Sequence, residues 1–352
     1  MKSQIGCLQL EEKMADLVEV TTQEIFKAFP GMEERYGKEG LQRCREDIGF
    51  HYAYLKTAIC FDEKELFADY FKWVHHFFKS INLPAAYTDE PFEIIVRVSG
   101  SLLDSGPAGE VKEYIRYALE QGAGSSAPPA SFIADDNQLN LLATQYLNAL
   151  LRRDRALAER LISDALENEV SVKDIYLHVF QPAQLEIGRL WQENKISVAM
   201  EHYFTAATQF IMSRHYHYIF SSEKMPWNMV ATSVSGELHE LGIRMVSDFF
   251  ELEGWNTTYL GSNTPDNAIV NMLRETDADV LAISATIPFN LPNVTQLIRF
   301  VRGEMKNDAP RILVGGRAFS SNPELWKKME ADGFATDAEG AVKTAGNLIN
   351  LK

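Results

Sequence analysis

The chain has 352 residues, of which 46% are hydrophobic, and it carries a formal net charge of −15. This length and composition describe a globular chain with room for two or three domains. The acidic balance repels a phosphate backbone and no long run of Lys or Arg offsets it, so direct nucleic-acid binding is not expected.

The first residues, MKSQIGCLQLEEKMADL, contain acidic side chains and lack the apolar core of a signal peptide. No segment has the apolar length that spans a bilayer, so we expect a cytoplasmic protein with no membrane partner. The cysteines, Cys7, Cys44 and Cys60, show no CxxC spacing. They predict neither a disulfide framework nor a zinc site, and we expect small, buried or idle side chains.

Residues 1–121 are expected to form an all-helical domain. Breaks occur at FPG (29–31) and INLP (81–84), and apolar residues recur at helical spacing in 9–29, 38–60, 64–81 and 90–120. The stretch GAGSSAPPAS that begins at residue 122 neither continues a helix nor supplies core side chains, so we place a linker at 122–135.

Residues 136–222 return to helical spacing in four segments with short breaks, which predicts a four-helix bundle. From residue 228 the pattern changes to short β-rich apolar runs that alternate with helical segments: NMVATSV, WNTTYLG, DVLAISA, RILVGG and GFAT. That alternation predicts a doubly wound parallel sheet with helices on both faces over residues 228–352. The expected fold class is therefore multi-domain, α followed by α/β.

Polar and small residues follow three of the expected strands. In an open parallel sheet, ligands bind beyond the carboxyl ends of the strands, so these residues should line one site. They are Glu237, His239 and Gly242 after the first strand, Ser284 and Thr286 after the third, and Gly315 and Gly316 after the fourth.

The order E-x-H-x-x-G, S-x-T and G-G at successive strand ends resembles that of cobalamin-binding domains, and the resemblance covers residues 136–352. Such domains usually have Asp where this chain has Glu237. The resemblance implies that His239 is the lower axial ligand of cobalt, in place of the cofactor's own benzimidazole, and that Gly242 leaves room for the nucleotide tail. It assigns the slot for that tail to Ser284, Thr286, Gly315 and Gly316. Cobalt accepts imidazole well, and a ligating histidine needs an acceptor such as Glu237 on its other nitrogen.

The stretch GRLWQENKISVAMEH, residues 188–202, places Trp191 ten residues before Glu201, which His202 follows. This spacing resembles the cobalamin-binding subfamily in which the bundle caps the upper face of the corrin. The resemblance implies that the indole packs on an adenosyl group and that Glu201 and His202 complete the pocket, hence adenosylcobalamin rather than a methyl-carrying corrinoid. The alternative is a core tryptophan beside an exposed Glu–His pair.

Adenosylcobalamin serves radical enzymes and light sensors, because its cobalt–carbon bond breaks homolytically. The chain has no pattern for the barrel of about 250 residues that mutases use, so we expect a light sensor and not an enzyme. It resembles the cobalamin photoreceptors that control carotenoid genes. Those have a histidine directly after the tryptophan, where this chain has Gln192, so a bis-histidine photoproduct is not expected; water or His202 would take the vacant position.

Residues 36–78 resemble the globin-like helical domain of photocobilins, which combine cobalamin with biliverdin. The resemblance implies a bilin slot lined by aromatic and imidazole groups. The residues of those types are His51, Tyr54, Trp73, His75 and His76. An ordinary aromatic core with histidines on a solvated face fits equally well. Haem, and covalent bilin attachment through Cys44 or Cys60, are weaker alternatives.

No kinase, cyclase or phosphodiesterase pattern is present, so we expect output through a homo-oligomer or a separate signalling partner. Two other functions stay open. A corrinoid carrier for methyl transfer would keep His239 but need an open upper face, against which Trp191 argues. If the chain is an interaction module without a cofactor, His239→Ala should leave its affinity for cobalamin and the cobalamin spectrum unaltered.

Overall fold

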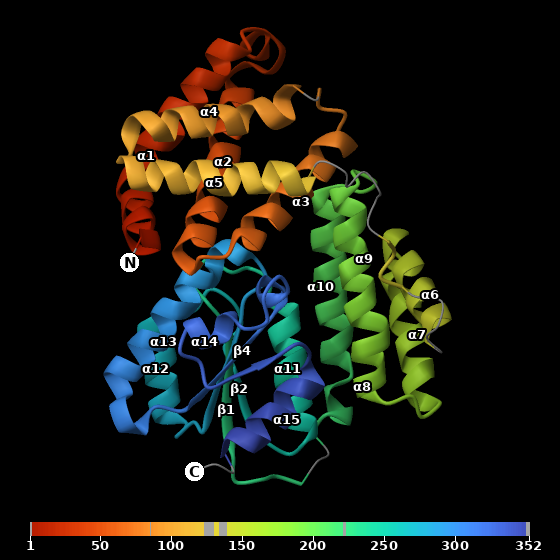
Figure 1. Cartoon of the computed structure of the whole chain (residues 1–352). Helices are drawn as coiled ribbons and strands as arrows, with labels where there is room; N and C mark the ends of the chain where they lie inside the picture. Colours follow the sequence, from red (N-terminus) through yellow and green to blue (C-terminus); the bar gives the residue numbers. More distant parts are fainter. Residues whose placement is uncertain (1, 85, 123–129, 134–138, 221–222, 350–352) are drawn as a thin grey trace. The chain divides into compact units, whose positions relative to one another are not determined.

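The computed structural model describes residues 2–84, 86–122, 130–133, 139–220 and 223–349 (Figure 1). The chain divides into two compact units, Met1–Ala127 and Pro128–Lys352, and each is described by itself. Most of the expected linker, residues 123–129 and 134–135, lies outside the described residues. No helix in the described ranges is both long and apolar enough to cross a membrane.

The first unit is helical, as predicted. Its helices are α1 (Lys2–Ala28), α2 (Gly31–Phe61), α3 (Lys64–Ser80), α4 (Ala86–Leu102) and α5 (Ser105–Gly122). The single helical segment expected over 90–120 is instead two helices that meet at Leu103 and Asp104. Pro107 accounts for the break, because its ring would clash with a carbonyl group in the preceding turn of a continuous helix.

The expectation that the cysteines do not pair is wrong for two of them. Cys7 of α1 and Cys60 of α2 form a disulfide, with their Cα atoms 5.0 Å apart. The packing of α1 on α2 brings together positions separated by 53 residues, and sequence spacing does not reveal such a pair. Cys60 is therefore not free to attach a bilin, whereas Cys44 is a half-buried thiol whose pKa burial raises to about 12.

The second unit begins with the predicted bundle. Its helices are α6 (Asn140–Leu151), α7 (Arg155–Glu167), α8 (Val172–Ile175), α9 (Gln181–Gln192) and α10 (Val198–Arg214), and a π-helical turn at Tyr176–Phe180 joins α8 to α9. Side chains fix where three of these helices begin: Asp154 accepts a hydrogen bond from the N–H of Leu157, Ser171 accepts one from Asp174, and Ser197 accepts one from Met200. The four predicted segments are thus present, and the third consists of α8, the π-helical turn and α9 without a break.

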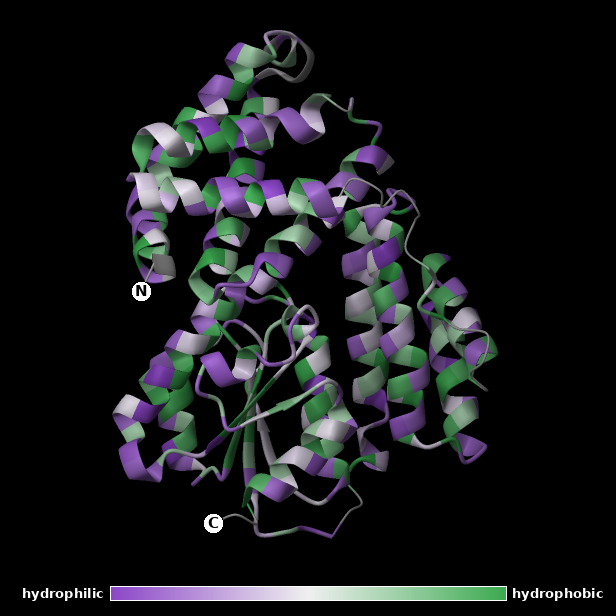
Figure 2. Ribbon diagram, in the orientation of Figure 1, coloured by the Kyte–Doolittle hydropathy of each residue, from purple (hydrophilic) through white to green (hydrophobic). Residues whose placement is uncertain are grey.

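A five-stranded parallel sheet follows, in the order β2-β1-β3-β4-β5. The strands are β1 (Asn228–Ser233), β2 (Asn256–Tyr259), β3 (Val280–Ser284), β4 (Arg311–Gly315) and β5 (Gly333–Ala335). The helices that alternate with them are α11 (Leu241–Leu252), α12 (Asp266–Glu275), α13 (Leu291–Met305), α14 (Leu325–Lys328) and α15 (Ala338–Ile349). The central strands are largely apolar and buried, and the helices around them mix hydrophobic with hydrophilic residues (Figure 2). This arrangement confirms the predicted doubly wound fold.

Helix α11 joins the sheet to the bundle, because its two faces are both apolar. Ile243 and Phe250 pack on the sheet with Met229 and Trp255. Met245 and Phe249 belong instead to the core of the bundle. The helix that follows His239 is thereby held on both sides.

Polar contacts reinforce this joint. The Tyr176 hydroxyl donates to Asp248 at 2.8 Å, and Arg244 donates to the hydroxyl groups of Tyr216 at 3.2 Å and Ser213 at 2.6 Å. Gln209 of α10 donates to Glu240, the residue after His239, at 2.8 Å. Asp248 is 6% exposed, and burial raises its pKa to about 6.

We expect Asp248 to make stability fall as the pH rises through its titration. Its folded pKa of about 6 lies above the ordinary value of 3.8, so between these values the folded state holds a proton that the unfolded state has lost. Asp248→Asn removes this titration. The free energy of unfolding of the variant, relative to that of the wild type, should therefore rise by up to about 3 kcal/mol between pH 4 and pH 7. Urea unfolding across that range measures the difference, and parallel curves for the two proteins would contradict the prediction.

Gly316→Ala should destabilise the second unit by at least about 2 kcal/mol. Gly316 has φ +102, and an added Cβ atom would lie 2.3 Å from the backbone oxygen of Ala285. The matched control is Gly303→Ala on α13, where an added Cβ meets nothing within 4 Å and should stabilise the helix by about 0.5–1 kcal/mol. Denaturant unfolding of the two variants should move the midpoint in opposite directions; equal shifts would refute the strain at Gly316.

Candidate functional site

The carboxyl ends of the three middle strands form a level edge. Ser233 of β1 lies opposite Ser284 of β3, which lies opposite Gly315 of β4. β2 lies on one side of β1 and β3 lies on the other, so the order of the strands reverses between β1 and β3. Such a switch point is where open parallel sheets bind ligands. Ser233 had no part in the predicted site, because a serine within an apolar run carries no distinguishing signal.

His239 and Glu237 form the central pair of the site. The His239 Nδ1 atom lies 2.6 Å from Oε1 of Glu237, and the His239 backbone N–H donates to the same oxygen at 3.0 Å. The Glu237 side chain has no exposed surface, whereas that of His239 is 54% exposed. Because Nδ1 is hydrogen-bonded to the carboxylate, Nε2 is the ring nitrogen that can bind a metal.

The second oxygen of Glu237 binds the segment that leaves β3. Its Oε2 atom accepts hydrogen bonds from the backbone N–H groups of Thr286 at 2.8 Å and Ile287 at 3.1 Å, and from the Asn290 side-chain amide at 3.1 Å. Thr286 therefore contributes its backbone to the site. Asn290 was not predicted, since an asparagine just before a helix ordinarily suggests only a cap.

The hydrogen bonds set the charges of the pair. Burial alone raises the pKa of Glu237, but the bonds from the His239 ring and from the backbone of His239, Ile287 and Thr286 outweigh it and bring the pKa to about 2. The bond to Glu237 raises the pKa of His239 above 6.5, against the opposing effect of burial. A metal at Nε2 would therefore compete with a proton for that nitrogen.

The predicted small residues have different surroundings. Gly242 is exposed, and a Cβ atom added there would meet nothing within 4 Å, so open space lies beside the first turn of α11. Gly315 and Gly316 instead allow close backbone contact: an added Cβ would lie 2.8 Å from the oxygen of Ala335 and 2.3 Å from that of Ala285, respectively. Ser284 is buried, and its Oγ atom lies 3.0 Å from the place that a Cβ atom on Gly316 would take.

Two charged residues act on the His239 ring from other elements. The negative charge of Glu201 on α10 raises the pKa of His239, and the positive charge of Arg317 after β4 lowers it. Glu201 also holds the His202 ring, with Nδ1 at 2.6 Å from its Oε2 atom. His202 is itself 76% exposed. Glu201 is therefore near enough to His239 to act on its charge, and its place in a cofactor pocket stays a prediction.

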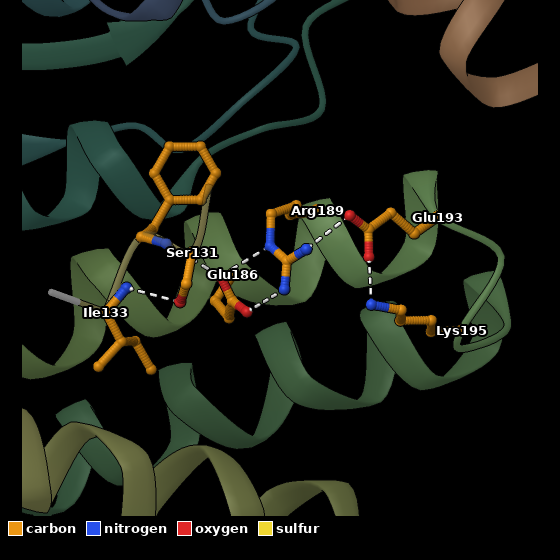
Figure 3. Close-up of polar contacts among 7 residues, drawn as sticks. Ser131, Ile133, Glu186, Arg189, Glu193 and Lys195 are labelled. Carbon is orange, nitrogen blue, oxygen red and sulfur yellow. Dashed lines mark hydrogen bonds and ion pairs between the residues drawn. The ribbon is translucent and has the colours of Figure 1, made fainter. Parts of the chain in front are cut away.

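Trp191 lies half-buried at the end of α9, on a helix that is fixed by a chain of ion pairs (Figure 3). Arg189 donates to Glu186 at 2.5 Å and to Glu193 at 2.6 Å, and Glu193 also binds Lys195 at 2.5 Å. The side chains of Arg189, Glu186 and Glu193 are only 11%, 7% and 7% exposed.

The same network holds the segment that enters the bundle. Glu186 accepts a hydrogen bond from the backbone N–H of Phe132 at 3.0 Å, and the Phe132 ring lies 6.0 Å from the Arg317 guanidinium. Phe132 thus contacts both α9 and the loop after β4. Neither Arg189 nor Phe132 was predicted, because charged and aromatic residues of this kind are common on helices and in linkers.

In the first unit, the residues expected around a bilin pack on other side chains of the same unit. His51 is 3% exposed, its Nδ1 atom lies 2.7 Å from the Tyr70 hydroxyl, and burial lowers its pKa to about 3. Tyr54 stacks on Tyr70 with ring centroids 3.7 Å apart. Trp73 is 36% exposed and stacks on Phe77 at 5.6 Å. His75 pairs with Asp89 at 2.9 Å, and His76 follows it half-buried.

Comparisons with known proteins bear on the second unit. Residues 227–345 match the model of the B12 binding domain, and residues 142–215 match a second B12 binding domain model. The chain is 28% identical over 129 residues to dimethylamine corrinoid protein 3 of Methanosarcina acetivorans, covering 36% of this chain and 59% of that protein. It is 26% identical over 122 residues to a corrinoid protein of Desulfitobacterium hafniense, covering 34% and 55%. The chain thus spans little more than half the length of these curated relatives.

A structural comparison supports the fold. The structure of the Methanosarcina barkeri monomethylamine corrinoid protein aligns with a TM-score of 0.54 and 17% identity, over 61% of this chain and 100% of the other. This match concerns the fold alone, whereas the two domain matches support a cobalamin-binding family and the binding of cobalamin.

The expectation of a light sensor with biliverdin as a second chromophore is wrong. The matched relatives are named corrinoid proteins, and several of them dimethylamine corrinoid proteins, which agrees with the alternative of a corrinoid carrier. The error arose at the upper face, since the spacing of Trp191, Glu201 and His202 does not identify the organic group that lies against them.

Arg189→Met should destabilise the second unit by about 3 kcal/mol, because it leaves Glu186 without its cation and Glu193 with Lys195 alone, both largely buried. The control is Arg214→Met, which removes an ion pair with Glu159 in which the arginine is 56% exposed, and should cost about 1 kcal/mol or less. Urea unfolding measures the loss of stability in each variant. Equal losses would show that the ion pairs on α9 add no more stability than the exposed Arg214–Glu159 pair.

Proposed function

We propose that this chain, whose residues 142–215 and 227–345 match the B12 binding domains of a cobalamin-binding family, is a corrinoid carrier for methyl transfer. In this role it is not itself the catalyst and serves a separate methyltransferase. The observation that carries the proposal is the His239–Glu237 pair, in which one ring nitrogen is held at 2.6 Å and the ring is 54% exposed.

The residues present fit a corrinoid. Within the described ranges, no group of three or more His, Cys, Asp or Glu side chains is arranged to hold a metal ion. The edge of the sheet offers one imidazole instead, which suits a metal whose in-plane positions are filled by a macrocycle. The open space beside Gly242 would take the nucleotide tail. Bound cobalamin supplies a cobalt atom that accepts and releases a methyl group.

The chain's own groups have defined roles in this proposal. His239 would bind the lower face of the corrin and Glu237 would hold its ring and the proton on Nδ1, with Thr286 fixing the carboxylate through its backbone. Ser284, Gly315 and Gly316 would shape the floor of the tail slot through their close backbone packing. The joint at α11 would keep the bundle over the edge of the sheet.

The donor and the partner follow from the relatives' names. Because these are dimethylamine corrinoid proteins, we propose a methylated amine as the methyl donor and a methyltransferase as the partner. Which residues cover the upper face of the corrin is still a prediction. Trp191, Glu201 and His202 would cover the corrin on that side, and a flat indole suits either an adenosyl group or the bare ring. Homo-oligomer formation is likewise still a prediction.

His239→Ala should abolish the absorption signature of histidine-bound cobalamin and weaken cobalamin binding by more than about 10-fold, since it removes the cobalt ligand. His178→Ala is the matched control: its side chain is 44% exposed and belongs to the π-helical turn of the bundle. Absorption spectra and a binding titration report both effects.

The carrier role has its own readout. Wild-type protein loaded with cobalamin, with the cobalt reduced to Co(I) by an added chemical reductant, should take up methyl from dimethylamine and release monomethylamine when a methyltransferase is supplied. Adenosyl loading should give no transfer. Unchanged cobalamin affinity and spectrum in His239→Ala would indicate an interaction module without a cofactor. Histidine-bound cobalamin without methyl uptake from any methylated amine would refute the carrier and leave the binding site in place.

A further inference from the structure

Glu237 is a fully buried carboxylate that must be held by hydrogen bonds. Placing such a charge out of water is costly unless N–H groups replace the lost water. Its two oxygens face different partners. Oε1 faces the backbone and ring of His239, and Oε2 faces the segment after β3. The orientation of the His239 ring therefore depends on what fixes Oε2.

Asn290 differs from the other groups that reach Oε2. Thr286 and Ile287 contribute backbone N–H groups, which any residue other than proline would supply, whereas Asn290 contributes its side-chain amide at 3.1 Å. Asn290 is 1% exposed and ends the short helical turn Pro288–Asn290 directly before α13. Its place is thus set by the backbone on both sides.

The other end of the Asn290 amide faces the loop that carries His239. A Cβ atom at Gly236, which has φ +83, would lie 3.5 Å from Oδ1 of Asn290. Asn290, directly before α13, therefore faces the loop after β1 at two points: its amide nitrogen bonds to Glu237 and its amide oxygen lies near Gly236. A glutamate has one more rotatable bond than an aspartate, so its carboxylate needs a further contact to keep one orientation.

We propose that Asn290 is a positioning residue for the cobalt ligand. It acts through Glu237: the amide and the two backbone N–H groups fix Oε2, and this directs Oε1 at Nδ1 of His239 and leaves Nε2 for cobalt. The proposal rests on the proposed function only where cobalt is concerned, because the hydrogen bonds are those of the protein alone.

The test compares Asn290→Ala with Asn293→Ala. Asn293 lies three residues further on, and its amide donates at 2.8 Å to the backbone oxygen of Ser235, so it braces the same loop without contacting Glu237. In the cofactor-free protein, ¹⁵N chemical shifts of the His239 ring under alkaline conditions report which nitrogen carries the proton. We expect the proton on Nδ1 in the wild type and Asn293→Ala, and a mixture of Nδ1 and Nε2 forms in Asn290→Ala.

Cobalamin binding gives the second readout. Asn290→Ala should weaken it by about 10- to 100-fold and lower the fraction bound through histidine, while Asn293→Ala changes either by less than about 3-fold. Amide NMR spectra of the apo variants establish that both are folded. If Asn290→Ala does not fold, Asn290→Ser, which shortens the side chain and retains a polar group, takes its place in every arm.

A double-mutant cycle separates positioning from general support of the loop. If Asn290 acts through Glu237, then adding Asn290→Ala to Glu237→Gln should produce no further loss of histidine-bound cobalamin. Additive losses, or a wild-type ring tautomer in Asn290→Ala, would overturn the proposal. Failure of methyl transfer with the tautomer effect intact would instead count against the carrier function alone.

Discussion

The site depends on one hydrogen bond, from the ring of His239 to the carboxylate of Glu237. It joins an exposed ring to an anchor that has no exposed surface, and it selects which ring nitrogen remains available. The cost of burying the carboxylate is offset by N–H groups from two loops, one after β1 and one after β3. The site therefore exists only where β1 and β3 are neighbours, and the fold supplies that through its strand order.

Much of this could be predicted from the sequence. The apolar runs give the strands because buried parallel strands are nearly continuous in Val, Ile and Leu, and the change of period at residue 228 marks the start of the sheet. The pairing of Glu237 with His239 also follows, because residues two apart in a loop beyond a strand can both face the edge. The break in the long helical segment at Leu103 and Asp104 was missed because apolar spacing continues across it, although Pro107 is a signal that could have been used.

Two of the missed interactions join residues far apart in the sequence. Asn290 lies 53 positions from Glu237, and Cys7 lies 53 positions from Cys60, so only the packed structure brings either pair together. The function was mistaken for a related reason. A tryptophan, a glutamate and a histidine define the shape of a cap, but the group beneath it depends on contacts that spacing does not contain. The corrinoid relatives agree better with the proposed carrier than with a light sensor.

The most direct measurement is electron paramagnetic resonance of the protein with reduced, paramagnetic cobalamin, after labelling only the protein's histidines with ¹⁵N. The spectrum reports the nuclear spin of the axial nitrogen. If His239 binds cobalt, each line of the wild-type spectrum should split in two, as one ¹⁵N nucleus requires, and the splitting should vanish in His239→Ala. A three-fold splitting from ¹⁴N, unchanged by the label, would show that the cofactor keeps its own base and would contradict the role assigned to His239.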